Sequence, residues 1–190
     1  MNEEDESRPR VAGPARARAR AAPALPVRCL VVVLLAACAL ALPREAPADD
    51  LAGPELASAD QGASIRQLGR GNSALADQRG PRQSASLQQQ GFGNRLEVWQ
   101  SGGPGNTVYA YQRGMGNEAV LTQSGQWNAL RLDQRGDGNL ANVAQHGVGR
   151  HAFIEQFGSG NRIDLVQGQS APNVVLRQYG DGNVTTLIQH

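Results

Sequence analysis

Residues 134–145 read Gln-Arg-Gly-Asp-Gly-Asn-Leu-Ala-Asn-Val-Ala-Gln, and this stretch decides the fold. A glutamine is followed by a Gly-x-Gly-Asn sequence and then by a short run that closes on a second glutamine, eleven residues after the first. Ten of the eleven steps between such glutamines are eleven residues long and one is twelve, which predicts a repeat architecture of stacked units. The glutamines of the series are Gln67, Gln78, Gln89, Gln100, Gln112, Gln123, Gln134, Gln145, Gln156, Gln167, Gln178 and Gln189.

Two kinds of turn sequence alternate along this series, so the complete unit has about 22 residues. After every second glutamine the sequence is Gly-x-Gly-Asn, and the intervening turns are looser, as in residues 80–83 and 125–128. A tight chain reversal needs a positive φ angle, which glycine adopts without a Cβ clash. The glycines predicted to form the tight turns are Gly69, Gly71, Gly91, Gly93, Gly114, Gly116, Gly136, Gly138, Gly158, Gly160, Gly180 and Gly182.

The seven residues from each turn to the next glutamine have the pattern of a β-strand. Side chains of a strand alternate between two faces, so the second and fourth residues after the turn share a face with the closing glutamine. Of these 24 positions 23 are apolar, and Thr185 is the exception. A helix would show a period of 3.6 residues instead. The pattern predicts an all-β, amyloid-like β-solenoid of six two-strand rungs.

The same inward face carries amides. A buried amide destabilises a fold unless it is hydrogen-bonded. Equivalent side chains in stacked rungs lie about 4.8 Å apart, so their amides can bond in a ladder along the stack. The alternative is that these residues are only polar turn residues. The asparagines predicted to join the glutamines in structural ladders are Asn72, Asn94, Asn117, Asn139, Asn161 and Asn183.

The N-terminal quarter shows no repeat. Residues 29–42 form an apolar run, which is short for a membrane span and typical of the core of a signal peptide. We predict a secretory leader over residues 1–48, a flexible segment over residues 49–60 and the repeat domain over residues 61–190.

The start and the processing of the leader have alternatives. Cys38 ends a sequence that fits a bacterial lipoprotein cleavage box, so lipidation at this residue stays open. The leader ahead of the apolar run is also long, and a true start near Val27 would leave a compact signal. Both cysteines, Cys29 and Cys38, lie in this segment, so ordinary cleavage near Ala48 would leave no thiol for redox chemistry.

Charge gives no indication of a nucleic-acid partner. From residue 49 onward the chain has 11 arginines, 12 acidic residues and no lysine, and the positive charge is not clustered.

One outward column, formed by Tyr109, Arg131 and Phe153, could make cation–π contacts worth about 0.5–1 kcal/mol each, or could be a chance alignment.

No catalytic, metal or cofactor site is predicted. The three histidines, His146, His151 and His190, have no acidic partner at a recognisable spacing. Each Gly-x-Gly is followed by a strand and not by a helix, which is unlike a phosphate-binding loop. The turns also lack the repeated aspartate of calcium-binding solenoids. We therefore expect a protein that is not an enzyme and takes no small-molecule substrate.

The repeat resembles the curlin repeat found in the subunits of bacterial curli amyloid fibres. The pattern Gln-x-Gly-x-Gly-Asn-x-Ala-x-x-x-Gln is closest in residues 67–78, 112–123 and 134–145, and the resemblance covers residues 61–190. Where the curlin pattern has serine, six residues before the first glutamine, this chain has other residues, including Arg150 and Pro172. These departures leave open whether the chain is a major or a minor, nucleating subunit.

The resemblance implies a function at the cell surface. It implies a fibre subunit or nucleator, exported through the periplasm, that serves adhesion and the biofilm matrix by templated stacking of strands. Its partners would be further copies of itself, other curlin subunits, and the curli export pore and chaperones. The alternative is a β-solenoid that does not polymerise and acts as a surface-binding adhesin.

Overall fold

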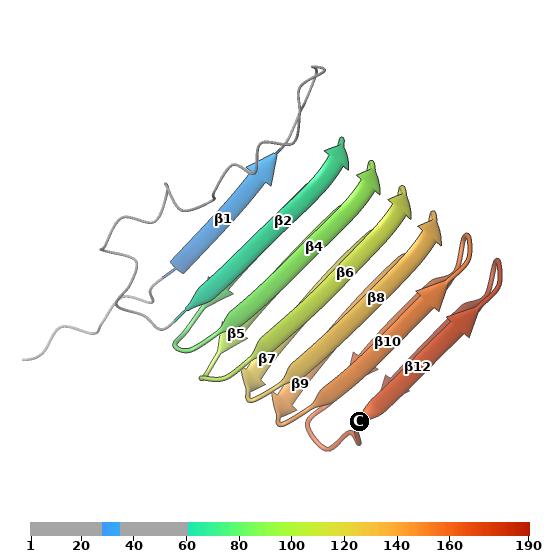
Figure 1. Cartoon of the computed structure of the whole chain (residues 1–190). Coiled ribbons are helices and arrows are strands. Elements are labelled where there is room, and N and C mark those ends of the chain that lie inside the picture. The colour runs from blue at the N-terminus through green and yellow to red at the C-terminus, as the bar shows by residue number, and fades with distance from the viewer. Residues whose placement is uncertain (1–27, 35–60) are drawn as a thin grey trace, which may run out of the picture.

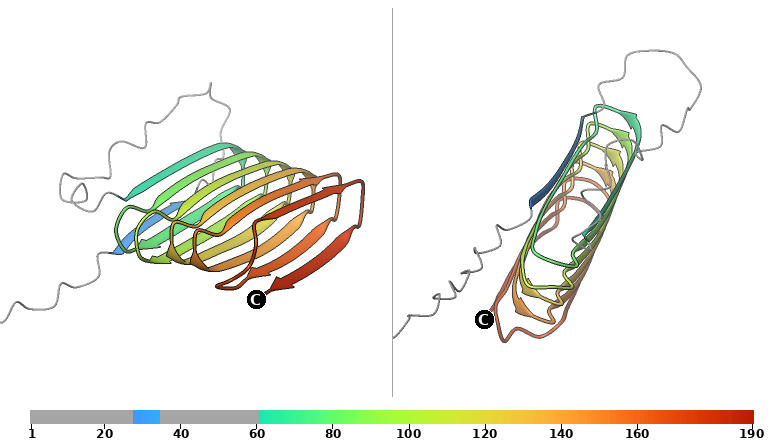
Figure 2. Two further views of the ribbon diagram at one scale, coloured as in Figure 1. Left: turned by 90° about the horizontal axis from the view of Figure 1, so that it is seen from below. Right: turned by 90° about the vertical axis from the view of Figure 1, so that its left-hand side faces the viewer.

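The computed structural model describes residues 28–34 and 61–190, which form a flattened β-solenoid without helices (Figure 1). Two sheets lie face to face, and the chain passes from one to the other at each turn (Figure 2). Even-numbered strands form a six-stranded sheet, here called the even sheet, and odd-numbered strands form a seven-stranded sheet, the odd sheet. The predicted all-β solenoid of six two-strand rungs is confirmed, from β2/β3 to β12/β13.

The strands begin after the turn residues, as the sequence pattern predicts. The even sheet contains β2 (Gly62–Arg70), β4 (Ser84–Phe92), β6 (Thr107–Met115), β8 (Ala129–Asp137), β10 (His151–Phe157) and β12 (Val174–Tyr179). The odd sheet contains β1 (Arg28–Leu34), β3 (Ser73–Arg79), β5 (Arg95–Gly102), β7 (Glu118–Gln126), β9 (Leu140–Val148), β11 (Arg162–Gln167) and β13 (Val184–Gln189).

From β2 to β13 every pairing is parallel and in register, one repeat apart. Gln112 of β6 lies opposite Gln134 of β8, and Ala141 of β9 lies opposite Ile163 of β11. The single twelve-residue step leaves this register intact, because the extra residue is absorbed in the turn between β5 and β6. Equivalent side chains are therefore stacked in columns that run the length of the solenoid.

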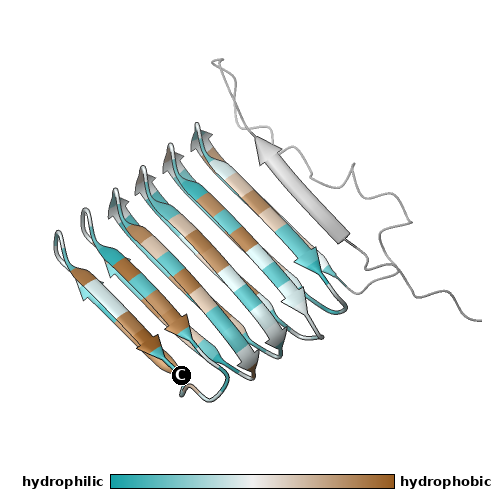
Figure 3. Cartoon of the chain, turned by 180° about the vertical axis from the view of Figure 1, so that it is seen from behind, coloured by the Kyte–Doolittle hydropathy of each residue, from teal (hydrophilic) through white to brown (hydrophobic). Residues whose placement is uncertain are grey.

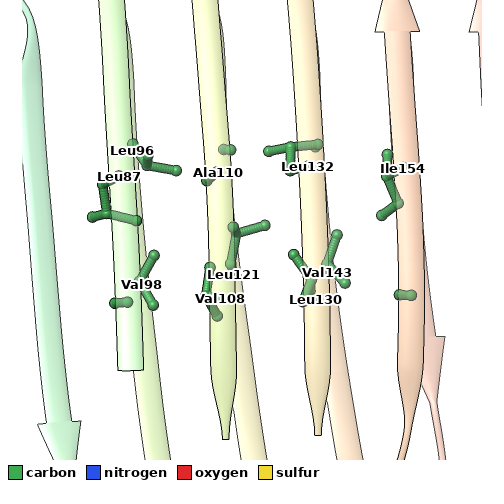
Figure 4. Close-up of a cluster of buried hydrophobic side chains, with 14 of the residues drawn as sticks. Leu87, Leu96, Val98, Val108, Ala110, Leu121, Leu130, Leu132, Val143 and Ile154 are labelled. Carbon is green, nitrogen blue, oxygen red and sulfur yellow. The ribbon is translucent and has the colours of Figure 1, made fainter. Parts of the chain in front are cut away.

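The hydrophobic core is the thin layer between the two sheets. Inward residues such as Leu96, Leu121 and Leu132 are 0–1% exposed, and Figure 4 shows their side chains between the facing strands. Apolar and polar segments alternate along the strands in Figure 3, as expected for sheets buried on one side only. The terminal rungs are less covered, and Ile65 and Leu187 are only partly buried.

The first glycine of a tight turn is required where the backbones of two rungs stack closely. Gly136 has a φ of 112°, and a Cβ atom at this residue would lie 2.1 Å from the carbonyl oxygen of Gly158 in the next rung. Two of the looser turns adopt positive φ without glycine, at Arg82 (51°) and Trp127 (57°). These two loose turns therefore keep the left-handed conformation at a residue that is not glycine, whereas the turn over residues 168–172 has no positive φ.

One edge of the odd sheet is covered by a strand from outside the repeat. The pattern shows no capping element, yet β1 pairs antiparallel with β3 over seven residues, from Arg28 opposite Arg79 to Leu34 opposite Ser73. This segment belongs to the run predicted as a signal-peptide core. The predicted cleavage site, Cys38 and the segment of residues 49–60 lie outside the described residues.

Candidate functional site: amide ladders and stack ends

A column of glutamine side chains runs along the even sheet. Each Nε2 donates to the Oε1 of the glutamine one rung nearer the C-terminus. Gln134 also donates to the carbonyl oxygen of Glu118 at 3.2 Å, so the same amide joins this sheet to the odd sheet. The donor–acceptor steps are Gln67 to Gln89 (2.7 Å), Gln89 to Gln112 (2.8 Å), Gln112 to Gln134 (2.8 Å), Gln134 to Gln156 (2.8 Å) and Gln156 to Gln178 (2.9 Å).

The odd sheet has a matching glutamine column that stops one rung early. Gln167 lies opposite Gln189 in the strand pairing, but its Nε2 donates to the carbonyl oxygen of Pro172 at 2.7 Å. The turn before β12 brings the carbonyl oxygen of Pro172 close to Gln167. The hydrogen bond to Pro172 therefore takes the place of the expected bond from Gln167 to Gln189. The steps formed are Gln78 to Gln100 (2.8 Å), Gln100 to Gln123, Gln123 to Gln145 and Gln145 to Gln167 (2.9 Å each).

An asparagine column at the tight turns runs with the opposite polarity. Asn139 donates from its Nδ2 to the Oδ1 of Asn117 at 3.0 Å and to the carbonyl oxygen of Gly158 at 2.9 Å. Its backbone N–H also donates to the Oδ1 of Asn117. The pattern recurs through Asn72, Asn94, Asn117, Asn139, Asn161 and Asn183.

A second, shorter asparagine column lies at the loose turns, and its residues are not among the predicted ladder residues. Asn106 and Asn128 are both fully buried, and Asn128 donates from its Nδ2 to the Oδ1 of Asn106 at 3.1 Å. At Arg150 only the backbone N–H continues the column, by donating to the Oδ1 of Asn128 at 2.9 Å. The signal was present in the sequence, because asparagine closes both of these loose turns.

The burial of the amides makes their hydrogen bonds matter for stability. Gln112, Gln134 and Asn117 are 0% exposed. A buried amide without partners destabilises the fold by about 1–3 kcal/mol, whereas here donors and acceptors are matched from rung to rung. That these amides hold the stack together stays a prediction.

Unpartnered acceptors gather at the ends of the solenoid. The buried Oε1 atoms of Gln67 and Gln78, in the first rung, accept no hydrogen bond within the described residues. At the last rung the Nε2 of Gln178 donates to the Oγ1 of Thr185 at 2.9 Å, where a seventh rung would offer a glutamine. The Oε1 atom of Gln189 also has no partner there. The ladders are thus directional, with acceptors free at the N-terminal end.

Ion pairs lie on the outer faces of the sheets. Hydrogen bonds to Asp133, at 3.0 and 2.9 Å, raise the pKa of the Arg135 guanidinium above its ordinary value. The hydrogen bond with Asp164 likewise raises the pKa of Arg162. The pKa of Asp164 is lowered first by the hydrogen bond from Arg162, at 2.7 Å, and then by that from Asn142, at 2.8 Å.

Arginines and aromatic rings stack on the outer face of the even sheet. In the outward column the guanidinium carbon of Arg131 lies 5.8 Å from the centroid of Phe153, and within the described residues Arg131 makes no such contact with Tyr109. The sequence column did not reveal that Arg177 approaches the same ring at 5.5 Å, or that Arg135 lies 5.1 Å from the ring of Phe157. These contacts join neighbouring columns, and a search along one column misses them.

The end of this outer stack is aromatic. The ring of Tyr179 stacks on that of Phe157, with centroids 5.5 Å apart and an angle of 8° between the planes. The pKa of the Tyr179 hydroxyl is raised, first by loss of solvent and then by its hydrogen bond to Glu155 at 3.2 Å. An aromatic surface is therefore presented in the last rung.

The histidines are not gathered into one site. His146 lies on the outer face of β9, where its Nδ1 is 2.6 Å from the Oγ of Ser124, and His151 lies at the start of β10. Within residues 28–34 and 61–190 no group of three or more histidine, cysteine or acidic side chains is arranged to hold a metal ion. No helix in the described part of the chain is long and apolar enough to cross a membrane.

The comparison with known families matches this geometry. Residues 128–168 match the family model described as the curlin associated repeat, a stretch that covers β8, β9, β10 and β11. No curated protein and no solved structure matches the chain. The matched rungs pair in the same parallel register with the rungs on either side. Residues 128–168 therefore carry a curlin associated repeat, set within a β-solenoid, which is a structural architecture.

Proposed function

We propose that the chain is a secreted structural subunit, or the nucleator, of curli-like amyloid fibres on the bacterial cell surface. Such fibres would serve adhesion and the biofilm matrix. The partners that we infer are further copies of this chain, other curlin subunits, and the export pore and chaperones of a curli system. The observation that carries the proposal is the complementarity of the two ends of the solenoid.

The ends match because the repeat is regular. If β12 and β13 of one copy pair with β2 and β3 of the next in the existing register, Gln178 is placed to donate to the free Oε1 of Gln67. The free Oε1 of Gln78 would face Gln189 in the same way. Strand addition of this kind also pairs the open backbone edges, and backbone hydrogen bonds at sheet edges contribute much of the affinity.

The proposal predicts that the purified chain converts from monomer to fibres. We expect the fibres to bind thioflavin T and to give diffraction reflections near 4.8 Å along the fibre and about 10 Å across it. Sonicated fibres should shorten the lag phase of fresh chain, because their ends are templates. A chain that stays monomeric for days at high concentration, with strand-rich circular dichroism, would favour the adhesin that does not polymerise.

The leader is expected to slow this assembly. In the full chain β1 occupies the edge of β3, where the β13 strand of another copy would have to pair. Removing residues 1–48 should therefore shorten the lag phase of thioflavin T fluorescence several-fold. In the uncleaved chain, Val32→Pro should produce much of the same shortening, because proline lacks the N–H that a paired strand needs. Equal lag phases in all three chains would show that β1 does not protect this edge.

A further inference from the structure

Charge is unequally divided between the two outer faces of the solenoid. The even strands carry six arginines and three acidic residues. The arginines are Arg66, Arg70, Arg113, Arg131, Arg135 and Arg177, and the acidic residues are Asp133, Asp137 and Glu155. The odd strands from β3 to β13 carry three arginines and four acidic residues. The arginines are Arg79, Arg95 and Arg162, and the acidic residues are Asp77, Glu97, Glu118 and Asp164. The even face is therefore the one that attracts anions.

Several arginines of the even face are held in place by aromatic rings. Arg131 and Arg177 lie on Phe153, at 5.8 and 5.5 Å from its centroid, and Arg135 lies between Tyr111 (5.6 Å) and Phe157 (5.1 Å). All the cation–π contacts within the described residues belong to this face. A guanidinium positioned by packing loses less conformational entropy when it binds an anion, since fewer rotamers remain to be fixed.

A shallow groove of about 240 Å³ lies on this face over β6, β8, β10 and β12. It passes over the small side chain of Ala129, so that neighbouring larger side chains form its walls. These walls combine aromatic, cationic and amide groups, and they include Tyr109, Arg131, His151, Phe153, Asn173 and Val175. No carboxylate lines the groove.

Arg131 is the central donor of the groove. Within the described part of the chain Arg131 contacts the ring of Phe153, and no carboxylate forms an ion pair with Arg131. Arg135 and Arg162, by contrast, are each bonded to an aspartate two residues away, and Arg177 is paired with Glu155 at 2.7 Å. Arg131 therefore keeps its hydrogen-bonding capacity for a group outside the chain.

We propose that the outer face of the even sheet binds an acidic polysaccharide, with the carboxylates of the polymer on Arg131 and its neighbours. The groove offers a bidentate guanidinium for a carboxylate, and the amide of Asn173 and the ring of His151 for sugar hydroxyls. Further arginines lie on the same face in other rungs, Arg113 on β6, Arg135 on β8 and Arg177 on β12, and this spread suits a linear polyanion better than a single small anion.

The same geometry argues against single-stranded nucleic acid. Binding of that kind relies on bases that stack on free aromatic faces. Here Phe153 is contacted by two guanidinium groups, and Phe157 by Arg135 and the ring of Tyr179. The rings of Phe153 and Phe157 are occupied by these contacts and are not free as stacking platforms for bases.

The test measures binding of the full chain to immobilised polygalacturonate, at a chain concentration below that of fibre assembly. Neutral dextran and a single-stranded oligothymidylate are the comparison surfaces. We expect binding to polygalacturonate that weakens with added salt, little binding to dextran, and weaker binding to the oligonucleotide. Arg131→Gln combined with Arg177→Gln should weaken binding roughly tenfold.

The matched control is Arg95→Gln combined with Arg162→Gln, which removes the same charge from the odd sheet and should change binding less than about twofold. Replacing Arg131 and Arg177 by lysine keeps the charge and should recover part of the affinity. Circular dichroism confirms that each variant is folded, and fibre assembly is assayed separately, so that a failure of assembly is not mistaken for a failure of binding. Equal losses from the two faces, equal binding to dextran, or tighter binding to the oligonucleotide would overturn the proposal.

Discussion

Replacing Gly136 by alanine is expected to destabilise the solenoid by about 3 kcal/mol or more, enough to prevent stable folding of the rungs around it. The residue has a φ of 112°, which residues with a Cβ atom rarely adopt. The added methyl group would also lie 2.1 Å from the carbonyl oxygen of Gly158, so the backbones of two rungs would have to separate. Urea unfolding of freshly refolded chain, followed by circular dichroism, measures the loss.

Gly138→Ala is the matched control, two residues along the same turn. Gly138 has a φ of 64°, within the left-handed region that other residues can adopt, and a Cβ atom there would meet nothing within 4 Å. Gly138→Ala should lower the free energy of unfolding by about 1–2 kcal/mol, which is the cost of the left-handed conformation alone. Similar losses for the two variants would show that φ, and not stacking of the turns, explains the glycine pattern.

The fold could be predicted from the sequence because one local rule is repeated with one period. The alternation that points Leu132 inward and Arg131 outward is visible in any single strand. The recurrence every 22 or 23 residues then places Gln112 beside Gln134 without any need to know the turn conformation. In a solenoid each rung touches only its neighbours, so the sequence period and the spatial register are the same quantity.

Features that depend on one rung alone could not be predicted in this way. The pairing of β1 with β3 joins a segment outside the repeat to the stack, and no periodicity indicates it. Gln167 follows the glutamine pattern, yet the local turn brings the carbonyl oxygen of Pro172 to its amide. The contacts of Arg135 and Arg177 depend on rotamers that cross between columns, which a strand pattern does not encode.

The polarity of the ladders also lies beyond the sequence pattern. Glutamine is both donor and acceptor, so a column of identical residues has no direction until one amide orientation is adopted. The structure has Gln67 and Gln78 donating toward the C-terminal end, which leaves both of their Oε1 atoms without partners. The asparagine column donates in the reverse direction. A second copy must therefore match two opposite polarities at once, which favours head-to-tail joining over joining of like ends.

Gln89→Leu is expected to lower the free energy of unfolding by roughly 3 kcal/mol. Gln89 is buried, donates to the Oε1 of Gln112 at 2.8 Å and to the carbonyl oxygen of Ser73 at 3.0 Å, and accepts from Gln67 at 2.7 Å. Leucine is similar in size but replaces none of these bonds, so the neighbouring amides remain buried and unpartnered. Urea unfolding measures the effect on the monomer.

The adjacent Gln88 gives a control that differs only in the face of the strand. Gln88 lies on the outer side of β4, where it is exposed, so Gln88→Leu should change the free energy of unfolding by less than about 0.5 kcal/mol. Seeded assembly should separate the two variants as well, because Gln89→Leu takes away the acceptor that orients Gln67 in the docking rung. Equal losses of stability and equal seeding rates for the two variants would show that the inner amides are only polar residues at the ends of strands. In that case copies of the chain would not be joined end to end through the free acceptors of these amides.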